Sequence, residues 1–594
     1  MRQKIISRLK LISENWIFWL ILITAIAIII RSIPAYLNPA WGVDFGIYYG
    51  LTNNFIDSKE FFNPYNGWGN SYQYFPVLYA ISGISHWITG IGLMEIMPKI
   101  APIFGGLTIP IFYFIVFELL KNRRIAILSA ALLSVATFHV YQTSHAAPLT
   151  IGHFFMMLSI YFFIKIATNK KYLIPLLITS SLLILSHHFT TYFYVISISI
   201  ILFSIISEDL KNKKDLFLLV YVVFISIFAF AYWALIAQPV FYNFIQSKMF
   251  ISPYLIIMLF YVMLIGGFIL IKIIKSYNIK FPKLTYFKGV SNIKKFLIFS
   301  FILLLLSFYA INRYIPGVYV KITPLAILYS LPMIFLISLS FTGFSELNKT
   351  PGGKFFLGWI LALSLSFLYS LMSSNMYPDR HLEYLIIPLC VPAAILINNM
   401  LSIKKTSIII KPNFSPFIKS LLKNNHTKTI ILIFVSIMCI SNMIAAYPTI
   451  NSLNHIDERV TTPCINVFQW MDGNISNKSV VASDHRLEML LWAEGFNITY
   501  GQTNNTWFSN NTLDCLLELK ELNVSYVLID DIMKNSVVNV DVGQYYYMSN
   551  QSYEKFTKKP YDLIYRNVTM GNNGMELHWV ELYKIDYSYM GIIL

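Results

Sequence analysis

Apolar runs of about 18 residues or more recur along this chain, and they constrain its fold more than any other feature. They extend from Trp16 to Tyr447, and each is long enough for a helix to cross about 30 Å of hydrocarbon. Because helices satisfy their own backbone hydrogen bonds in lipid, we expect this part to be a helical membrane bundle. Charged residues make up only 12% of the chain, against roughly 25% in soluble domains, which excludes a soluble fold for most of it.

Basic residues predict how these helices are oriented. Most of the 45 Lys and Arg residues fall in alternate loops, which include 121–124, 211–214, 272–295 and 404–428. Such an excess is typical of loops on the cytoplasmic side. Counting the apolar segment 75–93 as a span would reverse every later loop, so we expect a helix at the membrane interface there.

This bias predicts thirteen spans, a cytoplasmic N-terminus and a C-terminal domain on the opposite side, after a long first outer loop at 35–97. The net charge of +16 therefore indicates contact with anionic lipid rather than with nucleic acid. The expected spans are 16–34, 100–120, 125–142, 153–168, 172–187, 190–207, 216–236, 254–273, 296–312, 324–342, 355–372, 385–401 and 429–447.

The composition changes after residue 447, so we expect a membrane domain at 1–447 and a separate domain at 448–594. This tail is richer in acidic than in basic residues, and short strand-like and helix-like stretches alternate in it, which predicts a small α/β domain. The strand-like stretches are 479–482, 525–529 and 581–583, and the helix-like stretches are 486–493 and 513–522.

The tail is also rich in N-x-S/T sequons, which agrees with exposure to a glycosylation machinery. Its two cysteines, Cys464 and Cys515, could form a disulfide in an oxidising compartment. The sequons begin at Asn474, Asn477, Asn497, Asn504, Asn510, Asn523, Asn550 and Asn567.

Carboxylates are scarce outside the tail, and Asp44 is the most conspicuous of them. It lies in the run WGVDFGIYY at 41–49, shortly after the first span. A carboxylate among aromatic residues above a membrane opening suits a general base that takes a proton from a hydroxyl. The alternative is that Asp44 caps a short helix over 45–51.

Arg380 is the basic residue of the run YPDRHLEY at 377–384, between the eleventh and twelfth expected spans. Arginine is suited to holding a phosphate through two hydrogen bonds. The alternative is a local ion pair with Asp379 or Glu383. Arg313 and Lys321, in another outer loop, are further candidates for phosphate contacts or interfacial anchors.

Histidines also gather in the outer loops of the bundle. We interpret them as lining of a substrate cavity or as helix-end residues with satisfied hydrogen bonds, because their spacing lacks an HxH or HxxxH pair joined to a carboxylate. We therefore expect no bound metal. The candidate cavity residues are His145, His153, His187, His188, Tyr74, Tyr377, His381 and Glu383.

The order of these features resembles the GT-C superfamily of polytopic glycosyltransferases, which use polyprenyl- or dolichyl-phosphate-linked sugars at the outer face of a membrane. The resemblance rests on Asp44 in the first outer loop, the run YFP at 74–76, the basic turn at 121–124 and Arg380 in a late outer loop. The layout of thirteen spans and an outer domain is most similar to the catalytic subunit of oligosaccharyltransferase.

The chain departs from that subunit at two places. The subunit carries WWDYG in its globular domain, where this chain reads SDHRLE at 483–488, and an acidic metal motif in its second outer loop, where this chain reads SHAAPLT at 144–150. The resemblance thus implies a single-sugar transferase with no metal or cofactor, acting with inversion from a polyprenyl- or dolichyl-phosphate donor onto a hydroxyl. In it Asp44 would be the general base, and Arg380 would neutralise the departing lipid phosphate.

Two other functions remain open. One is transfer of a preassembled glycan, as in oligosaccharyltransferase, and the other is a non-enzymatic transporter or flippase of lipid-linked glycans. The acceptor could be a protein, a glycolipid or a growing lipid-linked glycan. The Ile-, Lys- and Asn-rich composition and the outer sequons hint at an archaeal plasma membrane with the C-terminal domain outside the cell.

Overall fold

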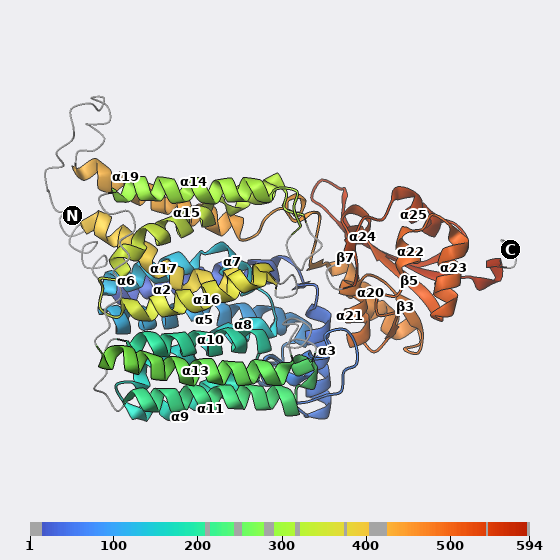
Figure 1. Cartoon of the computed structure of the whole chain (residues 1–594). Helices are drawn as coiled ribbons and strands as arrows, with labels where there is room; N and C mark the ends of the chain where they lie inside the picture. The colour runs from blue at the N-terminus through green and yellow to red at the C-terminus, as the bar shows by residue number, and fades with distance from the viewer. Residues whose placement is uncertain are drawn as a thin grey trace.

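The computed structural model has two parts, a bundle of long helices and a mixed α/β domain at one end of it (Figure 1). The described residues are 15–207, 214–242, 252–277, 290–314, 321–372, 377–402, 424–541 and 544–590.

Within those ranges, 11 helices are long and apolar enough to cross a membrane. Their outer surface is apolar: Phe224 and Phe301 are 53% and 63% exposed, as expected for side chains that face lipid. The chain is therefore a multi-pass membrane protein. The helices are α2 (Trp16–Leu37), α5 (Leu93–Leu120), α8 (Pro148–Ile166), α10 (His188–Ile206), α11 (Lys214–Leu235), α13 (Pro253–Ser276), α14 (Asn292–Ala310), α15 (Pro324–Leu347), α16 (Gly353–Met372), α17 (Pro378–Ser402) and α19 (Asn424–Ala445).

The other two of the thirteen expected spans are shorter helices. One is α9 (Leu173–Ile184), and the span expected at 125–142 is divided into α6 (Arg123–Ser134) and α7 (Thr137–Gln142). A broken helix leaves carbonyl groups without partners, and in lipid these must be satisfied within the protein. Here the guanidinium of the buried Arg31 donates to the Ser134 carbonyl at 3.0 Å.

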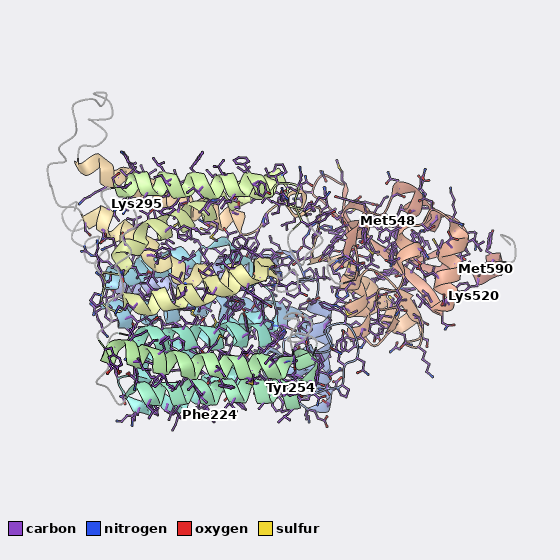
Figure 2. The ribbon with its side chains drawn as sticks, in the orientation of Figure 1. Phe224, Tyr254, Lys295, Lys520, Met548 and Met590 are labelled. Atoms are coloured by element: carbon purple, nitrogen blue, oxygen red, sulfur yellow. The ribbon has the colours of Figure 1, made fainter. Side chains whose placement is uncertain are left out.

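The bundle has two distinct ends. Figure 2 shows Lys295, at the start of α14, at the end far from the α/β domain, and Tyr254, at the start of α13, at the end near it. Lys295 is the last residue of the basic stretch 272–295, so this end of a predicted cytoplasmic loop lies opposite the domain. The segment expected at the interface forms α4 (Val77–Thr89), whose 13 residues are too few to span a bilayer.

The C-terminal domain is built on a five-stranded sheet in the order β4-β3-β5-β9-β8, which confirms the predicted α/β class. The strands β3, β4 and β5 are parallel, and β9 is antiparallel to both of its neighbours. The stretches predicted as strands became β3, β5 and part of β9, and those predicted as helices became α21 and α23. The strands are β3 (Val480–Ala482), β4 (Asn497–Ile498), β5 (Val524–Asp530), β8 (Tyr561–Met570) and β9 (Glu576–Ile585), and the main helices are α20 (Thr462–Asn474), α21 (His485–Ala493) and α23 (Thr512–Glu521).

The first outer loop joins this domain directly. Its strand β1 (Ala40–Trp41) pairs antiparallel with β2 (Arg459–Val460), and its helix α3 (Phe45–Ser58) packs on α21. Gly46 lets the two helices approach closely, because a Cβ there would lie 2.5 Å from backbone atoms of α21. The cysteines Cys464 and Cys515 are both buried free thiols, so the disulfide considered above is not formed.

Candidate functional site

Asp44 lies at the junction between the bundle and the C-terminal domain, just after β1. Gly42 adopts a φ of 118°, which turns the chain from β1 towards α3. Asp44 occupies the N-cap position of α3, but its side chain makes no capping hydrogen bond. Its carboxylate is 25% exposed and so remains available for another partner.

That partner comes from the C-terminal domain. The Nε2 atom of His485, the first residue of α21, lies 3.4 Å from Oδ1 of Asp44. The ring of Trp68 packs edge-on against the His485 imidazole, with 5.0 Å between centroids. The sequence did not single out His485, although it lies in the run 483–488 where the chain departs from the oligosaccharyltransferase pattern.

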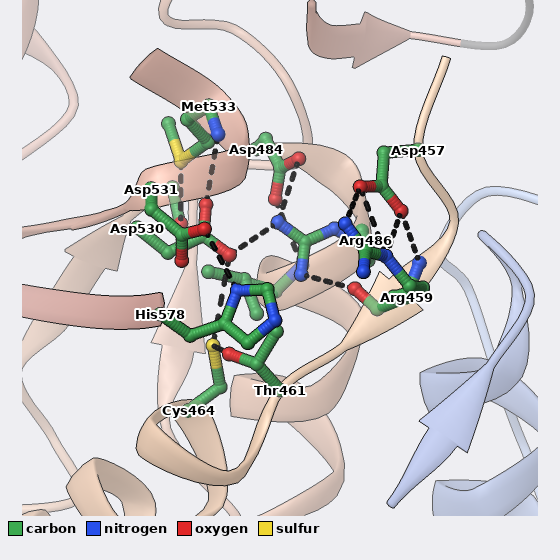
Figure 3. Close-up of polar contacts among 12 residues, drawn as sticks. Asp457, Arg459, Thr461, Cys464, Asp484, Arg486, Asp530, Asp531, Met533 and His578 are labelled. Atoms are coloured by element: carbon green, nitrogen blue, oxygen red, sulfur yellow. Dashed lines mark hydrogen bonds and ion pairs between the residues drawn. The ribbon is translucent and has the colours of Figure 1, made fainter. Parts of the chain in front are cut away.

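A buried ion-pair cluster fixes the start of α21 (Figure 3). The Asp484 carboxylate accepts a hydrogen bond from Leu487 N at 3.1 Å and so caps the helix. The guanidinium of Arg486 lies 2.7 Å from the carboxylate of Asp530, at the end of β5, and donates to the Arg459 carbonyl at 2.9 Å. Since Arg459 belongs to β2, the same cluster ties α21 to the strand that pairs with the first outer loop.

Arg380 lies at the first turn of α17, on the same end of the bundle. Its guanidinium donates a hydrogen bond to the side-chain oxygen of Gln142 and lies 3.9 Å from the Asp379 carboxylate. The side chain is 41% exposed, so part of its charge remains open to a ligand. The expected ion pair with Asp379 is thus present but long, and Gln142 is a partner that the sequence did not suggest.

Two tyrosines connect Asp44 and Arg380 electrostatically. Burial and the Asp44 carboxylate raise the pKa of Tyr72, and the Arg380 guanidinium lowers it. Burial, Glu458 and Asp44 raise the pKa of Tyr545 in the same way, and Arg380 again opposes them. Contacts between the segments agree with this. Trp41, three residues before Asp44, meets the Tyr141 ring edge-on with 5.3 Å between centroids, and the next residue, Gln142, accepts the hydrogen bond from Arg380.

His145 contributes to the wall of this region. Its ring stacks on Trp41 with 3.9 Å between centroids, and its Nε2 atom lies 2.9 Å from a Glu458 carboxylate oxygen. Trp41 and Glu458 also border a cavity of about 530 Å³ at the ends of α2 and α19. Because apolar residues such as Ile33 and Leu37 line it together with charged ones such as Arg459, the cavity is amphipathic.

The other four candidate histidines lie inside the bundle. His153 Nε2 lies 3.3 Å from a carboxylate oxygen of Glu383, and both side chains are fully buried. His187 Nδ1 lies 2.9 Å from the Thr190 hydroxyl. His381 Nε2 lies 2.9 Å from a serine hydroxyl of α16, and His188 packs on Phe75.

The remaining candidates are dispersed. Tyr377 immediately precedes α17, and Tyr74 accepts a hydrogen bond from Tyr232 through its carbonyl. Arg313 and Lys321 lie between α14 and α15, where Arg313 packs over the ring of Tyr309 in α14 and Lys321 over that of Tyr314. In the part of the chain that the structure describes, no recorded contact joins these two to Arg380, and no group of three His, Cys, Asp or Glu is arranged to hold a metal ion.

The chain has a helical bundle, a long first outer loop with an acidic residue and a mixed domain docked on that loop, and a solved glycosyltransferase has a similar fold. The archaeal oligosaccharyltransferase AglB from Archaeoglobus fulgidus, solved with an inhibitory peptide and a dolichol-phosphate, is similar to this chain with a TM-score of 0.55. The alignment has 14% identity and covers 87% of this chain and 70% of AglB, so the likeness is one of fold.

Two further similarities are weaker. ArnT from Cupriavidus metallidurans, bound to undecaprenyl phosphate, aligns over 95% of this chain and 98% of its own with 12% identity and a TM-score of 0.42. The mycobacterial arabinofuranosyltransferase AftD aligns over 96% of this chain and 40% of its own with 10% identity and a TM-score of 0.48. Neither score is high enough to add to the argument. No protein-family model and no curated protein matches the sequence.

Proposed function

We propose that this chain transfers one sugar from a polyprenyl- or dolichyl-phosphate donor to an acceptor hydroxyl at the extracytoplasmic face of a membrane. The observation that supports the proposal most directly is the short path of contacts between Asp44 and Arg380: Trp41, three residues before Asp44, packs on Tyr141, and the adjacent Gln142 bonds Arg380. Its fold, shared with a dolichol-phosphate-binding glycosyltransferase, supports the same conclusion.

In this mechanism the Asp44 carboxylate removes the proton of the acceptor hydroxyl while its oxygen attacks the anomeric carbon. The bond from that carbon to the phosphate oxygen breaks on the opposite side, so the configuration inverts. The lipid phosphate leaves with the bonding electrons, and Arg380 stabilises the negative charge that develops on it. His485 orients the Asp44 carboxylate through its Nε2 atom.

The amphipathic cavity beside Trp41 suits a substrate that has both a lipid and a polar part. Lys295, at the end of a basic stretch of the sequence, lies at the other end of the bundle, which supports an extracytoplasmic position for the site.

Purified protein supplied with a radiolabelled polyprenyl-phosphate sugar tests the proposal. We expect release of lipid phosphate and labelled product from the wild type, and a loss of turnover of at least about 10²-fold in Asp44→Asn. Arg380→Ala should raise KM for the donor. Near-normal turnover by Asp44→Asn would remove Asp44 from this role, and an effect of Arg380→Ala confined to the acceptor would contradict the phosphate assignment.

The fold shared with AglB supports a second candidate, transfer of a preassembled glycan to asparagine. In the run 483–488, however, His485 and Glu488 are 4% and 0% exposed, because the run is buried within the domain and against the first outer loop, which leaves little surface there for a peptide. A strict requirement for a divalent metal and for a lipid-linked oligosaccharide would favour the second candidate.

A further inference from the structure

The C-terminal domain has a second cavity, separate from the one beside Trp41. Its volume is about 530 Å³, within the range of about 300–1,000 Å³ that is usual for small-ligand sites. The described residues that line it are all aromatic or amide side chains, namely Asn504, Phe508, Gln544, Tyr546 and Tyr547.

This lining favours a carbohydrate. Tyr546 and Tyr547 are 50% and 59% exposed, and Phe508 meets Tyr546 edge-on with 5.5 Å between ring centroids. Exposed aromatic rings offer flat apolar faces on which the C–H faces of a sugar ring can pack. The amides of Asn504 and Gln544 can donate and accept hydrogen bonds with hydroxyl groups. Since the described lining carries no charged side chain, an anion is a poor match.

A single strand separates the cavity from the proposed catalytic region. Successive side chains of a strand point to opposite faces, so in β7 (Gln544–Tyr546) the outer two residues share one face and Tyr545 has the other. Gln544 and Tyr546 line the cavity, whereas Tyr545 lies on the side of Asp44 and Arg380, which both change its pKa. Figure 1 shows β7 at the boundary between the domain and the bundle.

A buried polar atom on the face of Tyr545 also lacks a partner. Asn539 of β6 (Val538–Asp541) is the cross-strand partner of Tyr545, so the two side chains share a face. Asn539 is 5% exposed, and its side-chain oxygen accepts no hydrogen bond within the described structure. This polar group lies on the face of the hairpin opposite to Gln544 and Tyr546, so the cavity and the catalytic region are on different sides of β7.

We propose that this cavity is a carbohydrate subsite, which holds sugars of an acceptor glycan while the reacting hydroxyl of that glycan lies at Asp44. The acceptor class is therefore an oligosaccharide that reaches across β7, rather than a bare amino acid side chain. This inference rests on the proposed function for the role of the bound glycan, but not for the binding itself.

Saturation-transfer NMR on the full chain in lipid nanodiscs tests the binding. The probes are trisaccharides of glucose, of mannose and of N-acetylglucosamine. We expect at least one to bind the wild type and to bind about tenfold more weakly to the double variant Tyr546→Ala, Tyr547→Ala, because two stacking rings are lost. Leu563→Ala is the control, since Leu563 is 50% exposed on the edge strand β8 of the same domain. Failure of all three to bind, or equal binding to the double variant, would overturn the subsite.

Turnover separates this inference from the proposed function. With a glycan acceptor, the double variant should raise acceptor KM about tenfold and leave kcat and donor KM unchanged. If the wild type transfers sugar but acceptor KM does not change, the acceptor role is wrong while the proposed function stands. If no sugar is transferred at all but the trisaccharide binds as described, the proposed function fails and the subsite remains.

Asn504 requires a separate control experiment, because it begins a sequon and borders the cavity. A glycan attached to Asn504 would have the same chemistry as an acceptor glycan. Protein made in a host without N-glycosylation keeps the Asn504 amide and should bind the trisaccharide as glycosylated protein does. Binding that appears only in the unglycosylated protein, with a glycan on Asn504 of the other sample found by mass spectrometry, would assign the cavity to the protein's own glycan and overturn the acceptor role.

Discussion

Gly46→Ala is a sharp test of how the C-terminal domain positions the candidate base. Gly46 lies on α3, two residues after Asp44, where this helix crosses α21. An alanine Cβ would lie 2.5 Å from Leu490 N and 2.5 Å from the carbonyl carbon of Met489. These are backbone atoms, so they cannot rotate away. Ordinary contact begins near 3.4 Å, so the helices must separate by about 1 Å.

A separation of this size should be visible in catalysis. It moves Asp44 on α3 away from His485 on α21, and a misplacement of about 1 Å can cost on the order of 10²-fold in rate. We therefore expect kcat to fall by about 10²-fold in Gly46→Ala. Donor KM should change little, because Arg380 lies on α17 and is held by Gln142. Crowding of a packed interface should also lower the free energy of unfolding by about 1–3 kcal/mol.

Steady-state transfer from the labelled donor measures both constants, and thermal unfolding of the detergent-solubilised chain measures stability. Gly473→Ala is the matched control: it also lies in a helix of the C-terminal domain, and its added Cβ meets no atom within 4 Å. A Gly46→Ala protein with wild-type kcat would refute the view that the contact between α3 and α21 sets the position of Asp44.

Three further predictions concern groups around the site. Arg486→Met should lower the free energy of unfolding by about 3–5 kcal/mol, because Asp530 would keep a buried charge without its partner. A decrease of less than about 1 kcal/mol, measured by chemical denaturation, would contradict this prediction. Burial raises the pKa of the Glu488 carboxyl to about 7. Between about pH 4.5 and 7 this carboxyl therefore keeps its proton in the folded state and loses it in the unfolded chain. The free energy of unfolding should fall by about 3 kcal/mol as pH rises through this range. Unfolding temperatures measured across this window should depend less steeply on pH in Glu488→Gln, and an unchanged dependence would contradict the assignment. Gln142→Ala should raise donor KM about tenfold by releasing Arg380, whereas unchanged initial-rate kinetics over a donor series would show that Gln142 does not position it.

The bundle could be predicted because the features that define membrane helices can be read directly from the linear sequence. Apolar length and the distribution of basic residues are both properties of the linear sequence, and they locate α2 or α17 without any tertiary information. The break between α6 and α7 was missed because it depends on a distant side chain. Arg31, from another helix, satisfies the Ser134 carbonyl and makes that break tolerable.

The candidate site was predictable only on the membrane side. Asp44 and Arg380 stand out because charged residues are rare beside apolar spans. His485 and Glu458 lie in a tail where charges are common, so composition could not distinguish them. They reach the first outer loop because segments far apart in the sequence pair, namely β1 with β2 and α3 with α21. Such long-range pairing leaves no periodic pattern in the sequence.

The arrangement around His485 indicates why the domain and the reaction belong together. Its neighbours in sequence are committed to the domain interior: Asp484 caps α21, and Arg486 is held by Asp530. These bonds fix the start of the helix, and so they aim the His485 imidazole at Asp44. Asp44, however, meets His485 only where the domain is docked on the first outer loop through β1 and β2. The bundle by itself would hold Arg380 in place but would leave Asp44 without the group that orients it, so loss of domain docking should abolish turnover before it abolishes donor binding.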